Sequence, residues 1–232
     1  MPTSPALFLG KMVHMGLEHY YRHRQLGVRL AGADVSRWLA DSWAQAVEAE
    51  TVAFESAAQE GTVRQQAVDL VTAYLARGPA DEPPPIAVEA VMEAPLVDPV
   101  TDEDLGIPLV GIVDLVVDAP GGPVVADFKT TARKGTPLEI SHEIQLSSYA
   151  YLFRRLTEGR EAALEIRSLI KTKTPKIEVH RYPAREEGHF RRLFAAIRAY
   201  LNDLERGRFV FRPGLACSFC DHRETHCRQW AG

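Results

Sequence analysis

The chain of 232 residues has little cysteine, no excess of positive charge and no long hydrophobic run. Its three cysteines lie between residues 217 and 227, and an odd, clustered set is more typical of metal binding in a reducing compartment than of a disulfide framework. The 27 Lys and Arg against 31 Asp and Glu leave no overall positive field, so any contact with a polyanion must be local. No apolar run is long enough for a signal peptide or a membrane span, and we therefore expect a cytoplasmic location.

The sequence does contain alternating helical and strand-like segments. Hydrophobic residues make up 46% and charged residues 25%, as in an ordinary globular protein with one sizeable core. Periodicity predicts helices over about 6–26, 35–58, 62–78, 142–156 and 185–206, and strands over about 86–94, 108–119, 123–130, 163–171 and 176–182. This order predicts one α/β domain with a mixed sheet over residues 1–232. We divide it into a helical part (about 6–78), a part with sheet and helices (about 86–206) and a cysteine-containing tail (211–230).

The segment VVADFKTT, residues 124–131, places an acid and a base at the end of an apolar strand. Asp127 and Lys129 are two residues apart, so on a strand their side chains point to the same face. They can therefore act on one object, or simply pair with each other.

Asp114 is a second unexpected acid, because it interrupts the apolar run GIVDLVVDA. A strand of this composition is expected to be covered on both faces, where an unpaired carboxylate costs several kcal/mol. The run lies one tight PGG turn before Asp127, so two acids are expected side by side, and one lysine cannot neutralise both. Either hydrogen bonds and ion pairs satisfy them, or a hard cation such as Mg²⁺ or Mn²⁺ does.

Five segments, LGKMVH, AVEAVME, GIVDLVVD, VVADFKTT and QLSSYAYL, occur in the order and at intervals similar to those of a known family. Together they resemble the RecB-like branch of the PD-(D/E)XK nuclease superfamily, from about residue 7 to residue 230. The resemblance implies a restriction-endonuclease-like fold, a mixed β-sheet flanked by helices. It also implies a metal site whose members are His14, Asp114, Asp127, the backbone carbonyl of Phe128 and, in a lesser role, Glu89. Lys129 is similar to the catalytic lysine of the family, and Gln145 and Tyr149 match its Q-x3-Y helix.

Each of these assignments has an ordinary structural alternative. His19 and His23 compete with His14 for the helix-borne histidine, although Gly10, one turn earlier on the same face, leaves room beside His14. Gln145 and Tyr149 could be a polar seam on a packed helix. The cationic turn formed by Lys171, Lys173 and Lys176 could be simply solvated, or it could contact phosphates.

The tail carries Cys217, Cys220 and Cys227, which look like the last three cysteines of the iron-sulfur members of this branch. The fourth cysteine of that [4Fe-4S] site lies near the N-terminus in the family and is missing here. Three explanations remain open: the intact protein starts earlier, His222 or His226 completes a zinc site, or the site is a relic.

The resemblance implies a Mg²⁺- or Mn²⁺-dependent nuclease that hydrolyses phosphodiester bonds in DNA, of exonuclease type and favouring single strands or ends. The family serves recombination, repair, CRISPR adaptation or phage replication, in some cases with a helicase partner. The alternative is an inactive DNA-binding or scaffold subunit of a helicase-nuclease complex. Inactive copies usually lose the lysine or an acid, and both Lys129 and the two aspartates are present, so we expect an enzyme.

Overall fold

The computed structural model describes residues 3–77, 82–132 and 139–208, together with residues 217, 220 and 222–227. The chain forms two compact units, Pro2–Leu193 and a smaller one made mainly of Phe194–Gly232, and each is described by itself. The expectation of a single domain over 1–232 stays a prediction. No helix among the described residues combines the length and the apolar character needed to cross a bilayer.

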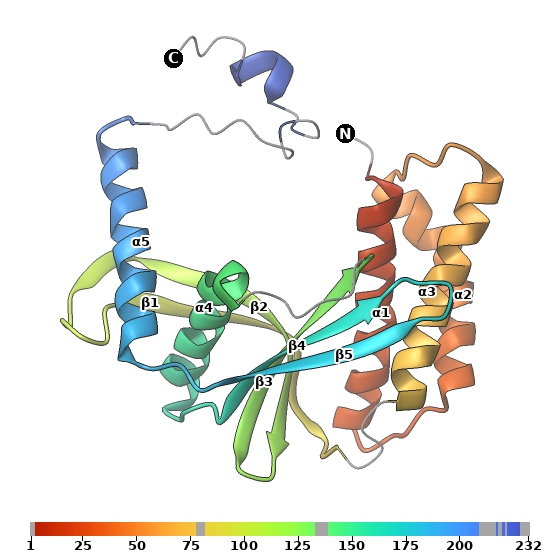
Figure 1. Ribbon diagram of the computed structural model, residues 1–232, viewed down its shortest axis with the longest axis horizontal. Coiled ribbons are helices and arrows are strands. Elements are labelled where there is room, and N and C mark those ends of the chain that lie inside the picture. The colour runs from red at the N-terminus through yellow and green to blue at the C-terminus, as the bar shows by residue number, and fades with distance from the viewer. Residues whose placement is uncertain are drawn as a thin grey trace. The chain divides into compact units, whose positions relative to one another are not determined.

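Three helices, α1 (Pro5–Gln25), α2 (Gly32–Glu50) and α3 (Ala57–Arg77), pack side by side (Figure 1). Helix α1 begins where the Ser4 hydroxyl accepts the N–H of Leu7, with proline in the first helical position, a favoured N-terminal arrangement. The helix predicted over about 35–58 is confirmed as far as Glu50, but its extension to residue 58 is wrong. Helix α2 ends at Glu50 because Thr51 adopts a left-handed φ of 50°, and Val52 then forms a parallel bridge with Thr3.

The sheet has five strands in the order β1-β2-β3-β4-β5. All neighbours are antiparallel except β3 and β4, which are parallel and are joined through helix α4 (Glu139–Thr157). A parallel pair needs such a crossover, whereas antiparallel pairs can be joined by short turns. The predicted mixed sheet and α/β order are therefore confirmed. The strands are β1 Pro85–Val97, β2 Asp104–Ala119, β3 Gly122–Thr131, β4 Ala163–Ile170 and β5 Lys176–Pro183.

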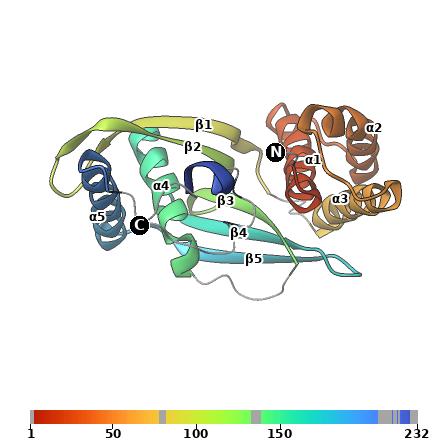
Figure 2. The same ribbon diagram turned by 90° about the horizontal axis from the view of Figure 1, so that it is seen from above.

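The helices cover two different parts of the sheet (Figure 2). Helices α1 and α3 contribute to one apolar core with Leu115 of β2 and Phe128 of β3. Helix α4 instead lies against β1 and β2, where Leu152 and Tyr149 pack close to Gly111. A side chain at Gly111 would come within 2.8 Å of Leu152, so this glycine allows the close approach.

Helix α5 (Glu187–Glu205) follows β5 and spans the boundary between the two units. Within the larger unit, its first turn packs Phe190 edge-on against Tyr151 of α4, with ring centroids 6.5 Å apart. Within the smaller unit, residues Arg223–Cys227 form one turn of π-helix, η2.

Candidate metal centre

The candidate site lies where β2 and β3 stop pairing. Their ladder ends at the pair Leu115–Ala126, and Asp114 and Asp127 are the next residues on the two strands. Both carboxylates are buried, and Oδ2 of Asp114 accepts the backbone N–H of Phe128 at 2.7 Å. The predicted neighbouring of the two acids across the PGG turn is thus found, and one oxygen of Asp114 is held by the backbone of β3.

Glu89 reaches the same place from β1 with an unusual backbone. The pairs Val88–Leu115 and Ala90–Val113 place it opposite Asp114, and its φ of 42° lies in the left-handed region that side chains other than glycine rarely adopt. Such strain persists only where the surrounding structure maintains it, and it is common at functional sites.

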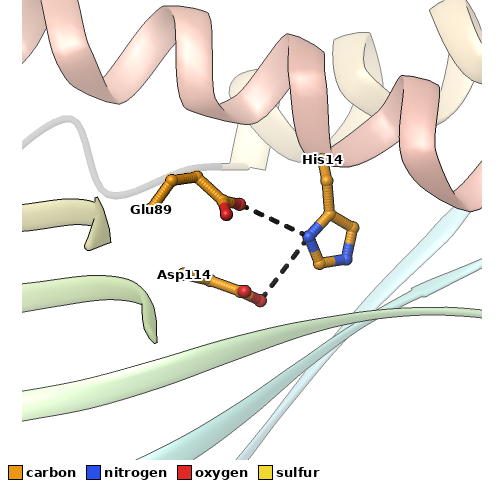
Figure 3. Close-up of side chains that lie close together, drawn as sticks. All are labelled: His14, Glu89 and Asp114. Atoms are coloured by element: carbon orange, nitrogen blue, oxygen red, sulfur yellow. Dashed lines mark ion pairs between the residues drawn. The ribbon is translucent and has the colours of Figure 1, made fainter. Parts of the chain in front are cut away.

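His14 projects from α1 toward both carboxylates (Figure 3). Its Nδ1 lies 3.6 Å from Oε1 of Glu89 and 3.6 Å from Oδ2 of Asp114, while its Nε2 lies 3.0 Å from the carbonyl oxygen of Phe128. A carbonyl can only accept, so Nε2 carries the hydrogen and Nδ1 faces the two acids. A lone pair directed at two carboxylates is unfavourable unless a proton or a metal cation lies between them.

The pKa values of the group reflect the same crowding. Burial lowers the pKa of His14, but the hydrogen bond with Glu89 and the charges of Asp114, Glu89 and Asp127 outweigh it and raise this pKa overall. Burial, followed by Asp127 and Glu89, raises the pKa of Asp114 to about 7, against the opposing effects of His14 and the Phe128 N–H. Both raised pKa values reflect an excess of negative charge, so an added proton or cation would stabilise this group of side chains.

These residues fit a hard divalent cation. His14, Glu89 and Asp114 each offer one ligand atom, and the three atoms lie within 4.8 Å of one another, the one such group among the described residues. A ring nitrogen whose partner nitrogen donates to a backbone carbonyl is the usual arrangement of a metal-binding histidine. Apart from its chain neighbours and the nearby backbone of α1, Gly10 has no atom within 4 Å of where a Cβ would stand, so the space at Gly10, one turn from His14, is open.

Asp127 and Lys129 form the second half of the site. Oδ2 of Asp127 forms an ion pair with Nζ of Lys129 at 2.8 Å. Gln145 of α4 donates to Oδ1 of Asp127 at 2.8 Å and to the hydroxyl of Tyr149 at 2.9 Å. The side chain of Lys129 is 36% exposed, so its ammonium group faces solvent, whereas Asp127 is buried and hydrogen-bonded to Gln145 of α4.

A family model for the PD-(D/E)XK nuclease superfamily matches residues 2–228. The chain belongs to this superfamily. A comparison with curated proteins found no match. Among solved structures, a proposed exonuclease from Eubacterium rectale is 14% identical with a TM-score of 0.49, over 85% of this chain and 75% of that one. The protein SSO0001 is 15% identical with a TM-score of 0.43, over 97% of this chain and 84% of that one.

In this PD-(D/E)XK protein, the residues that lie together in the structure differ in part from the ligand set expected from the sequence. Glu89, expected in a lesser role, lies in the group around His14, whereas Asp127 lies outside that group and acts on it through its charge. The Phe128 carbonyl, expected as a metal ligand, accepts a hydrogen bond from His14. The roles of all these residues stay predictions.

One neighbour was missed by the sequence reasoning. His142 of α4 is half-buried. Its pKa is lowered, mainly by burial and then by the charge of Lys129, against the opposing effect of Asp127. This histidine precedes Gln145 by three residues and Tyr149 by seven, so all three share one face of the helix. The spacing H-x2-Q-x3-Y could have revealed it.

The other two predicted groups, the lysine turn and the cysteines of the tail, stay predictions. Lys173 and Lys176 are exposed at the β4–β5 connection, and Lys171 donates its backbone N–H to Thr131 at the end of β3. The described cysteines form no metal group with one another or with His222. The side chain of His226 lies outside the described part. An iron-sulfur or zinc site in the tail stays a prediction.

Proposed function

We propose that this protein is a metal-dependent DNA nuclease of exonuclease type. The observation that supports this most is Nδ1 of His14 facing the carboxylates of Glu89 and Asp114, beside the Asp127–Lys129 pair. Membership of the PD-(D/E)XK superfamily supports hydrolysis of a phosphodiester bond.

The residues of the site have different chemical roles in this proposal. His14, Glu89 and Asp114 would hold Mg²⁺ or Mn²⁺, with Asp127 beside them as a further carboxylate, and such a cation would polarise a scissile phosphate and lower the pKa of bound water. Lys129 orients the attacking water or stabilises the charge that develops on the phosphoryl oxygens.

The remaining residues position these groups. The N–H of Phe128 fixes Asp114, and its carbonyl fixes the ring of His14. Gln145 and Tyr149 hold one oxygen of Asp127, which keeps the other oxygen beside Lys129. Gln145 and Tyr149 thereby support the centre as well as any substrate strand that passes α4.

The finer assignment rests on the five segments that resemble the RecB-like branch. That resemblance favours DNA over RNA, single strands or ends over internal duplex, and work in recombination, repair, CRISPR adaptation or phage replication. A helicase partner and a metal in the cysteine tail belong to the same proposal. The inactive-subunit alternative is less favoured, because the acids, the histidine and the lysine are all present and lie close together.

The test is incubation of purified protein with end-labelled single- and double-stranded DNA in Mg²⁺, Mn²⁺, Ca²⁺ or EDTA. We expect degradation with Mg²⁺ or Mn²⁺, none in EDTA, and binding without cleavage in Ca²⁺, whose looser coordination positions water poorly. Equal cleavage in EDTA would refute the metal mechanism. Binding without cleavage in every metal would favour the inactive subunit.

A further inference from the structure

Arg167 of β4 is the centre of a buried polar group that the proposed reaction does not use. Its guanidinium contacts Tyr21 of α1, Tyr74 of α3, Glu82 before β1 and Glu165 of β4. We call these five residues the Arg167 anchor. They come from two helices, from the sheet and from the segment leading into β1.

Each of the three nitrogens of this guanidinium donates to at least one acceptor. Nη1 donates to the hydroxyls of Tyr21 at 3.1 Å and Tyr74 at 2.8 Å. Nη2 lies 2.6 Å from Glu82 and 2.9 Å from Glu165, and Nε donates to Glu165 at 3.0 Å. Because each of its nitrogens is bonded within the fold, this guanidinium can hold other parts of the fold in place.

The first part that it holds is Phe128. Phe128 and Arg167 are register partners on the parallel strands β3 and β4. The Phe128 ring stacks on Tyr21 with centroids 6.0 Å apart and packs edge-on against Tyr74 at 5.5 Å. The backbone of the same residue binds both Asp114 and His14. Movement of the anchor would therefore move two members of the metal centre.

The second part is helix α1. Tyr21 follows His14 by seven residues, two turns along the same face, so fixing the Tyr21 hydroxyl fixes the rotation of the helix that carries His14. The hydroxyl also donates to Glu82 at 2.9 Å, and Arg24, one turn further, donates to the Glu82 carbonyl. Glu82 leads into β1, the strand that carries Glu89. The anchor thus connects α1, which bears His14, with the segment leading into β1, which bears Glu89, and it reaches Asp114 of β2 only through Phe128.

We propose that Tyr21 and Arg167 are positioning residues that set the distance between His14, Glu89 and Asp114 for cation binding. This rests on the proposed metal-dependent function and adds to it a source of geometry outside the site. Neither residue is among the three candidate ligands. The consequence is that loss of the Tyr21 hydroxyl weakens metal binding more than its cost in stability explains.

Tyr21→Phe tests this, since it keeps the ring against Phe128 and removes only the hydroxyl. Tyr151→Phe is the matched control. Tyr151 is 2% exposed against 0% for Tyr21, and its hydroxyl accepts the Val97 N–H at 2.8 Å near the far end of β1. Mn²⁺ titration by calorimetry, with thermal melts in EDTA, is measured for the full chain and both variants.

We expect both variants to melt earlier in EDTA, but only Tyr21→Phe to bind Mn²⁺ about tenfold more weakly, the lower end of the range for residues that orient metal ligands. Unchanged Mn²⁺ affinity in Tyr21→Phe, or an equal loss in Tyr151→Phe, overturns the inference while the proposed function stands. A parent protein that binds no Mn²⁺ overturns both. If Tyr21→Phe does not fold, Tyr74→Phe removes the other hydroxyl bonded to Arg167 and is expected to shift the affinity in the same direction.

Discussion

Replacing Asp114 by asparagine separates a metal ligand from a structural acid through stability alone. Asparagine has almost the same shape and keeps an oxygen that can accept the Phe128 N–H. Without metal, Asp114→Asn removes one of several crowded carboxylates. The metal-free variant should therefore be at least as stable as the parent near pH 8, and should lose the stabilisation that Mn²⁺ gives the parent.

The magnitude follows from the pKa of Asp114. Burial in the first place raises this pKa from 3.8 to about 7, so the folded state holds the proton more tightly than the unfolded state. The resulting stabilisation is complete below pH about 4 and is lost as the pH rises through about 7. Three pKa units correspond to about 4 kcal/mol, and a protonated His14 reduces that figure, because the two groups titrate together. In EDTA, we expect the free energy of unfolding of Asp114→Asn, relative to that of the parent, to increase by about 1 to 4 kcal/mol when the pH rises from 4 to 8.

Thermal and urea melts of both proteins in EDTA and in excess Mn²⁺, at pH 4.5 and pH 8, measure these differences. If Asp114 is a structural acid, the variant should be destabilised in EDTA by several kcal/mol, as on breaking a buried charge pair. Such a loss together with an unchanged Mn²⁺ shift would remove Asp114 from the metal centre, and much of the argument for a nuclease with it.

Three further outcomes are expected. Lys129→Ala should lower turnover on labelled DNA by about a hundredfold or more and leave Mn²⁺ affinity nearly unchanged; loss of metal binding would make Lys129 structural. Mn²⁺ affinity, measured by calorimetry, should fall as the pH drops below about 7, because Asp114 takes up a proton there; a flat profile from pH 8 to pH 5.5 would contradict the assigned ligand. Anaerobically purified protein should carry iron that absorbs in the visible or stoichiometric zinc, which Cys220→Ala loses, whereas metal-free protein of unchanged stability would indicate a relic site.

Helix and strand order could be predicted because both periodicities are local properties of the chain. The break between α2 and α3 could not. Hydrophobic spacing continues through residues 51–56, but Val52 is tied to Thr3 by a bridge between residues far apart in the sequence. That long-range contact, with the left-handed Thr51, ends the helix where the local pattern would continue it.

In the candidate site, the choice of His14 over its two competitors agrees with the observed contacts. His19 stacks on Trp38 with centroids 3.8 Å apart, and the ring of His23 bonds to the His19 carbonyl, so both have ordinary packing roles. The position of Glu89 was harder to foresee, because it depends on a positive φ within a strand. Residue type alone carries no signal for such a conformation outside glycine and, less often, asparagine or aspartate.

Asp114 and Arg167 are both charged residues within buried strands, and the way each charge is compensated distinguishes their functions. Arg167 pairs with the carboxylates of Glu82 and Glu165, and each of its three guanidinium nitrogens donates to an acceptor within the fold. At the candidate centre, three carboxylates, those of Glu89, Asp114 and Asp127, face one ammonium group and one imidazole. A buried charge that the protein compensates indicates architecture, whereas a surplus of negative charge around an oriented imidazole indicates a place for a cation. By this criterion we expect the Arg167 anchor to act through the architecture of the fold, and the centre around His14 to be the place where a cation binds.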